Sequence, residues 1–113
     1  QQASVSTEVV DNSDKVDRIA QRQAAAEMRK KLAPLRKQAD TQEKQLDKIQ
    51  HELQDLETVL ADNSLYEQAK KDLLKQHLAQ QTKLLQQQAE LEEAWMESLE
   101  ELEALQSELE ANI

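Results

Sequence analysis

Apolar side chains recur along the first half of this chain at alternating steps of three and four residues. This repeat begins at Leu32 and continues through Leu35, Ala39, Gln42, Leu46, Ile49, Leu53, Leu56 and Leu60. A second repeat of the same kind runs from Leu74 to Leu109. The alternation is the period of a coiled-coil seam, because it keeps one face of an α-helix apolar. The sequence therefore predicts two long helices that each carry one apolar stripe.

The chain contains no glycine and only one proline, Pro34. A β-sheet or a fold with many loops needs turn residues of these types, so the composition argues against both. Aromatic residues make up 2% of the chain and charged residues 33%, which leaves too few large side chains for a globular core. Two helices that share a single seam need no such core. The predicted fold class is all-α and elongated.

A short break over residues 61–64 separates the two stripes. Ser64 and Glu67 fit a capping box at the start of a helix, and Asn63 is expected to take the left-handed conformation of a helix end. We predict an antiparallel two-helix coiled-coil hairpin over residues 13–113, with a helix over 14–60, the turn over 61–64 and a helix over 65–111. Residues 1–12 are polar and aperiodic, and are predicted to be a disordered linker.

Pro34 falls inside the first predicted helix. A proline there removes one backbone hydrogen bond, so the helix should either kink or restart at this point. Strong helix formers such as Met28 and Leu32 surround it, and no turn residue lies nearby. We therefore expect one helix that is kinked near Pro34.

A tight turn fixes which residues of the two helices face each other. Each helix would be about 70 Å long at ~1.5 Å per residue. Gln42, Gln81 and Gln88 fall on the seam, where they would weaken it and hold it to one alignment. The expected facing pairs are Leu60 with Leu65, Leu53 with Leu73, Leu35 with Leu91, Met28 with Trp95, Ile19 with Leu105, and Val16 with Leu109.

Charge is distributed unevenly around a formal net charge of −9. Residues 15–48 carry ten basic and five acidic side chains, whereas residues 86–113 carry nine glutamates and no basic residue. The candidate binding residues are five basic side chains of the first helix: Arg29, Lys30, Lys31, Arg36 and Lys37. They could pair with glutamates across the hairpin, or contact the phosphates of RNA or DNA. Both interpretations remain open, and no aromatic residues alternate with these side chains to read bases.

No catalytic or metal-binding arrangement is visible in the sequence. A loop that cradles phosphates needs glycine, which the chain lacks. His51 and His77 have no partners at ligand spacing and are expected to be a surface residue and a seam-edge residue. Trp95 is expected to be a packing anchor. With no cysteine and no long apolar segment, neither a disulfide framework nor a membrane span is expected, and the predicted location is cytoplasmic.

Three segments carry a family resemblance: Pro34-Leu35-Arg36-Lys37, Leu60-Ala61-Asp62-Asn63-Ser64-Leu65-Tyr66-Glu67, and Ala94-Trp95-Met96-Glu97-Ser98-Leu99-Glu100-Glu101-Leu102. Together they resemble the C-terminal coiled-coil extension of the ABC-F family of ATP-binding cassette ATPases, in particular its YheS branch. The resemblance covers about residues 15–110. Many relatives have a proline at the position of Asn63. The chain begins at Gln1 rather than methionine, so it is expected to be a piece of a longer protein.

The resemblance implies a soluble bacterial parent with two ATP-binding cassettes that acts on ribosomes in translation. The similar extension of the related Uup protein is associated with DNA binding. None of the nucleotide-binding motifs of the family lies in this chain, so ATP and Mg²⁺ would belong to the cassettes of the parent and no cofactor or enzyme activity is expected here.

Two functions follow as hypotheses. The first is an accessory arm of an ABC-F ATPase, a monomeric hairpin that helps its parent engage ribosomal RNA or DNA. The second is a purely structural or protein-interaction coiled coil, which could form a dimer whose stripes pair between chains.

Overall fold

The computed structural model describes the backbone of residues 2–112 and the side chains of residues 13–112. Two long helices, α1 (Gln2–Leu60) and α2 (Lys71–Ala111), are joined by two short 3₁₀-helices, η1 (Asn63–Tyr66) and η2 (Gln68–Lys70). No strand occurs in this part of the chain. The prediction for residues 1–12 falls on residues whose side chains lie outside the described range, and it stays a prediction.

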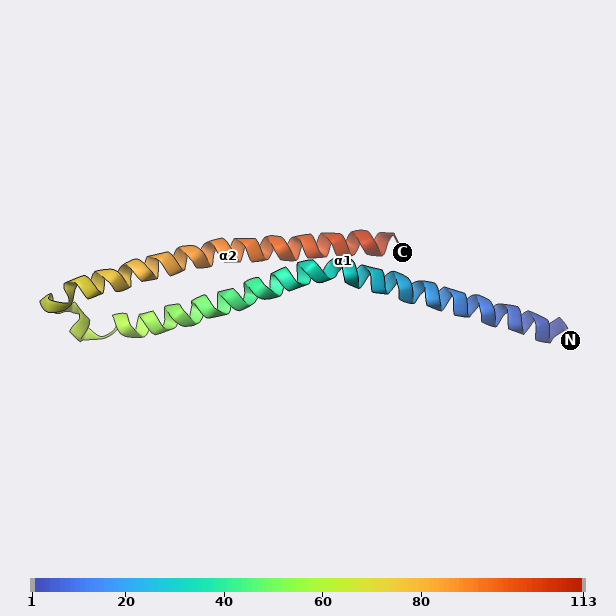
Figure 1. Ribbon diagram of the computed structural model, residues 1–113, viewed down its shortest axis with the longest axis horizontal. Coiled ribbons are helices and arrows are strands. Elements are labelled where there is room, and N and C mark those ends of the chain that lie inside the picture. Colours follow the sequence, from blue (N-terminus) through green and yellow to red (C-terminus); the bar gives the residue numbers. More distant parts are fainter. Residues whose placement is uncertain (1, 113) are drawn as a thin grey trace.

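The two long helices run antiparallel and pack against each other as a hairpin (Figure 1). The principal extents are 99 × 20 × 14 Å, so the molecule is a thin rod. The predicted all-α helical hairpin is therefore confirmed.

The apolar seam positions predicted from the sequence are among the residues that the hairpin buries. In α1 the buried and half-buried positions of the seam are Met28, Leu32, Leu35, Ala39, Gln42, Leu46, Ile49, Leu53, Leu56 and Leu60. In α2 they are Leu74, His77, Gln81, Leu84, Gln88, Leu91, Trp95, Ser98, Leu102, Leu105 and Leu109. Leu32 is the most enclosed, at 1% exposure. Each buried leucine contributes ~1.5–3 kcal/mol, so this seam is the main source of stability.

Helix α1 continues through Pro34 without ending. Figure 1 shows it bending in its teal section, the part of the helix that holds Pro34. The cause is the missing proline N–H, which leaves the carbonyl of Lys30 without its usual partner, together with the bulk of the ring. One kinked helix is what the sequence predicted.

The turn is longer than predicted, because α2 begins at Lys71 and not at residue 65. Asp62 provides the cap at this point: its Oδ1 accepts a hydrogen bond from the Ser64 amide at 3.0 Å. That bond, and further the charge of Lys70, hold the pKa of the Asp62 carboxyl below its ordinary value. The capping residue is therefore Asp62 and not Ser64, two residues earlier than expected. The chain after it forms η1, and the long helix α2 starts later.

Two details of the predicted turn are wrong. Ser64 forms no capping box with Glu67, since its hydroxyl accepts from Lys70 Nζ at 3.3 Å and the Glu67 amide donates to the Ser64 backbone carbonyl. Asn63 is not left-handed, because no non-glycine residue in the described part of the chain has a positive φ. The 3₁₀ turns reverse the chain with ordinary backbone angles.

The longer turn also changes the register. Leu91 lines one groove with Ile49, Trp95 lines another with Leu46, and Leu109 lines a third with Met28. The predicted partner of Leu91 was Leu35, two heptads away from Ile49. The expected pairs of Leu35 with Leu91 and of Met28 with Trp95 are therefore wrong, although apolar seam residues still face each other.

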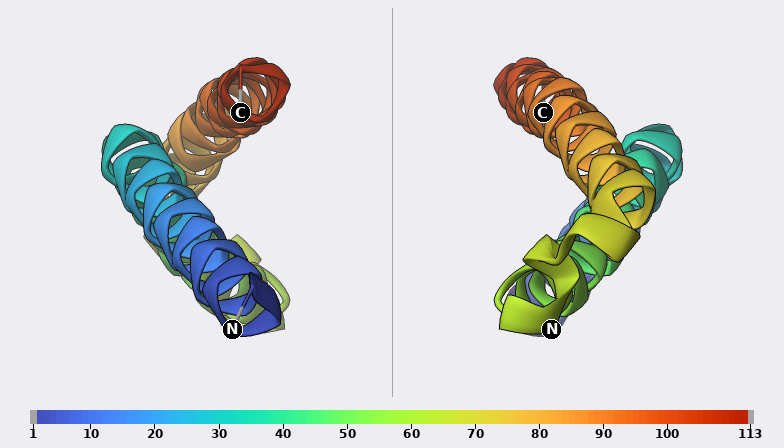
Figure 2. Two further views of the ribbon diagram at one scale, coloured as in Figure 1. Left: turned by 90° about the vertical axis from the view of Figure 1, so that its right-hand side faces the viewer. Right: turned by 90° about the vertical axis from the view of Figure 1, so that its left-hand side faces the viewer.

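This register leaves the beginning of α1 without a partner in the hairpin. Helix α2 ends at Ala111, level with the residues around Met28, and the side chains of residues 13–23 are all exposed. The views along the rod agree that this part of α1 leads away from the end of α2 (Figure 2). Val16 and Ile19, which were expected to face Leu109 and Leu105, are 64% and 53% exposed.

Candidate nucleic-acid interface

Basic side chains gather on one outer face of α1. A shallow groove there is lined by Arg29, Ala33, Arg36, Lys37, Asp40, Thr41 and Lys44. These residues follow the helical steps of three, four and seven, so a single helix brings them to one side. Thr41 Oγ1 donates to the Lys37 carbonyl at 2.9 Å, which ties its own side chain back to the helix. The groove is therefore a property of α1 alone.

The groove faces away from α2. The seam positions Leu32, Leu35 and Ala39 are turned toward α2, whereas Ala33, Arg36 and Lys37 are exposed to solvent. Because consecutive residues are ~100° apart around a helix, Ala33 and Lys37 lie well round from the seam. Cationic groups on this face can reach a ligand without disturbing the hairpin.

Three of the five predicted binding residues come together in this groove, and two do not. Arg29, Arg36 and Lys37 line it, whereas Lys31 lines a different groove, next to Leu109 at the end of α2. Lys30 is exposed and lines neither of these two grooves. Lys44 lines the basic groove but was not among the candidates. Its spacing of seven residues from Lys37 is the signal that could have identified it.

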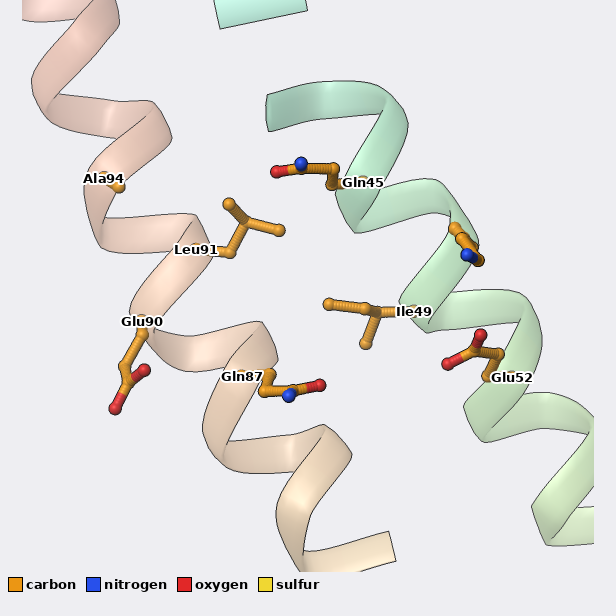
Figure 3. Close-up of a pocket in the computed structure, with 8 residues that line it drawn as sticks. Gln45, Ile49, Glu52, Gln87, Glu90, Leu91 and Ala94 are labelled. Atoms are coloured by element: carbon orange, nitrogen blue, oxygen red, sulfur yellow. The ribbon is translucent and has the colours of Figure 1, made fainter. Parts of the chain in front are cut away.

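The alternative interpretation paired these cations with the glutamates of α2. Within residues 13–112, basic side chains donate hydrogen bonds to the Asp14 carbonyl, from Arg18, and to Ser64 Oγ, from Lys70. No side-chain hydrogen bond in that range joins a lysine or arginine of α1 to a glutamate of α2. In the close-up of the groove between the helices, the carboxylate of Glu90 points away from α1 (Figure 3). The geometry leaves the basic groove available.

The groove in Figure 3 is the side of the seam rather than a reaction site. Ile49 and Leu91 point toward each other across it, with Gln45 and Gln87 at its polar edge. The cavity is open to solvent. Its apolar floor belongs to the contact that holds the hairpin together.

The two histidines lie where the sequence placed them, whereas Trp95 lies on the seam beside a different residue from the one expected. His51 is exposed, with Nδ1 2.8 Å from the Asp47 carbonyl oxygen, and His77 is half-buried on the seam. Trp95 is half-buried and lines a groove with Leu46, not with Met28. No cluster of three metal-ligating side chains occurs among the described residues.

No described helix is apolar over a long enough span to cross a membrane.

Comparisons with protein-family models, with curated proteins and with solved structures found no match. The geometry of the chain itself therefore carries the functional argument.

Proposed function

We propose that the chain is a nucleic-acid docking arm whose basic groove on α1 contacts backbone phosphates. One observation carries the proposal: Arg29, Arg36, Lys37 and Lys44 line a single groove that faces away from the acidic helix α2. Guanidinium and ammonium groups on one face are the usual means of holding a phosphate backbone.

The chemistry of the groove defines the kind of binding. Phosphate contacts release counterions, so affinity should fall steeply as salt rises. The groove holds no aromatic side chain on which a base could stack, and its one carboxylate is that of Asp40. We therefore expect binding that depends on charge and helix shape and not on base sequence.

The family resemblance extends this proposal to a parent protein. As the C-terminal arm of a cytoplasmic ABC-F ATPase, the hairpin would help its parent engage ribosomal RNA in translation, or DNA. ATP and Mg²⁺ would bind in the cassettes of that parent. The complete gene product tests this directly, because two Walker A motifs should precede the residues described here.

Charge reversal tests the groove. Arg29→Glu/Arg36→Glu/Lys37→Glu should weaken binding to a fluorescent RNA or DNA duplex by at least about tenfold. The slope of log affinity against log salt concentration should become shallower by about 0.9 for each phosphate that the protein no longer neutralises. Fluorescence anisotropy over a salt series measures both quantities. Lys30→Glu/Lys31→Glu, outside the groove, should have a smaller effect.

The matched control is Lys71→Glu/Lys75→Glu/Lys83→Glu on α2, which changes the net charge by the same amount. Equal weakening of binding in the two triple variants would show that only total charge matters, and would contradict the groove. Circular dichroism should show the same helix content in all variants.

The second candidate is a structural or protein-interaction coiled coil. One observation favours it: the apolar side chains of Val16 and Ile19 are exposed on a part of α1 that α2 does not reach. The two functions use different parts of α1 along its length, so the chain can serve both.

A further inference from the structure

The described side chains at the beginning of α1 have no packing partner in the hairpin. Residues 13–23, called here the free end, have exposed side chains throughout. The segment is continuous with the packed part of α1 and needs no nucleus of its own, but it gains none of the packing of one face that supplies most helix stability in proteins. A partner for this face would supply that packing.

The free end carries its own stripe. Val16, Ile19, Gln23 and Ala26 follow steps of three, four and three, and in the sequence Val5 and Val9 precede them at the same spacing. The seam of the hairpin, continued backward from Met28, would instead pass through Ala25 and Gln21. Each stripe position lies two residues before a position of the continued seam, and two residues correspond to about 200° around a helix. The stripe of the free end therefore faces nearly opposite to α2.

We propose that this stripe binds a second copy of the chain in a parallel, two-stranded coiled coil. Val16, Ile19, Gln23 and Ala26 would each meet their counterparts. This departs from the monomer expected from the sequence and does not depend on the nucleic-acid proposal. Since α2 lies on the other side of α1, pairing leaves both hairpins intact.

Charge complementarity favours a second copy of the chain as the partner, and favours the parallel direction. In a parallel pair, Arg22 faces Glu27 of the partner subunit, five positions later, and this pair of opposite charges occurs on both sides of the dimer. In an antiparallel pair with Val16 beside Ile19 of the partner subunit, Lys15 would lie next to Arg22 of the partner subunit. Like charges there are unfavourable, so the described residues favour the parallel arrangement.

The same pattern explains where pairing stops. The stripe continues after Ala26 as Lys30, Ala33 and Lys37. In a parallel dimer each lysine would meet its own copy, and such like charges repel. The two chains therefore pair before Lys30 and separate beyond it.

Sedimentation equilibrium over a concentration series tests the association. The mass should rise from 13.0 kDa toward twice that value as the concentration increases. Ile19→Lys should weaken the dimer at least tenfold, because it places a charge inside the paired stripe. Leu78→Lys is the matched control: Leu78 is 44% exposed, comparable to the 53% of Ile19, but lies on α2.

A charge exchange tests the direction. Arg22→Glu should weaken association, and Arg22→Glu/Glu27→Arg should restore it, since only the parallel pair brings these positions together. A monomeric mass at all concentrations would overturn the proposal, as would equal weakening by Leu78→Lys. A dimer that the double variant does not restore would overturn the parallel arrangement. Matching circular dichroism spectra confirm that the variants are folded.

Discussion

Gln42 places a polar group in the middle of an otherwise largely apolar seam. Its Oε1 atom is buried and has no hydrogen-bond partner among the described residues. Leaving a buried amide oxygen without a partner costs free energy that an apolar side chain of similar size would not. Such a residue can hold a coiled coil to one alignment at the expense of stability.

Replacing Gln42 should therefore stabilise the protein. We expect Gln42→Leu to raise the free energy of unfolding by about 1–2 kcal/mol, because the buried oxygen is removed and apolar surface is added. Urea denaturation followed by circular dichroism measures the change. Gln38→Leu, at an exposed position of the same helix, should change little. A less stable Gln42→Leu protein would mean that the oxygen is satisfied in solution.

Burial was predictable residue by residue where apolar character and period agreed, as at Leu32, Leu56 and Leu84. Ser98 shows the limit of that logic. It is 2% exposed, yet its polar side chain gives no apolar signal in the sequence. Its hydroxyl donates to the Ala94 carbonyl at 3.0 Å, so the polar group is satisfied within its own helix and can be buried.

At the scale of the element, the main feature of α1 is that it contains a proline and does not end there. Pro34 lies inside a helix of 59 residues, and its neighbours Leu32 and Leu35 are held by the seam. Packing on both sides of the proline outweighs the local absence of one hydrogen bond. The kink could be predicted because no turn residue lies near Pro34, so a break between two separate helices was not expected there.

Removal of the proline should strengthen and straighten α1. Pro34→Ala restores the hydrogen bond to the Lys30 carbonyl, and we expect the free energy of unfolding to rise by up to about 3 kcal/mol. Thermal unfolding and small-angle scattering measure stability and shape together. Gln38→Ala should shift stability by only a few tenths of a kcal/mol. If Pro34→Ala lowers stability, the bend itself supports packing against α2.

The connection between the helices was predicted less well than the helices. Its sequence offers two competing caps, Asp62 and Ser64, and the structure uses Asp62. Leu65 then turns inward and is 4% exposed, while the Tyr66 hydroxyl donates to the Leu60 carbonyl at 2.7 Å. These contacts depend on how α2 closes over η1, which local sequence signals do not contain.

At the scale of the whole molecule, the register was the feature that the sequence left undetermined. A heptad pattern is unchanged by a slide of seven residues, so apolar positions face each other in several alignments. The predicted alignment differs from the observed one by two heptads. The length and the path of the connection decide between them. The basic groove was more predictable, because residues spaced by seven lie on one face of a helix whatever its partner.

Paired spin labels distinguish the two registers, and the absence of cysteine from the chain makes the labelling specific. Glu52 and Gln87 line the same groove, so labels at Glu52→Cys/Gln87→Cys should give a short distance. Labels at Gln38→Cys/Gln87→Cys report the register predicted from the sequence and should be farther apart along the axis by about 21 Å. The reverse order of distances would refute the observed alignment.

The ten residues between the two long helices thus have an influence beyond their own position. A heptad repeat does not by itself oppose a slide of seven residues. The connection between the helices therefore selects one of the possible alignments of α1 and α2. A change in the conformation of this segment would therefore shift α2 along α1. The displacement would emerge at the opposite end of the rod, where α2 stops beside Met28.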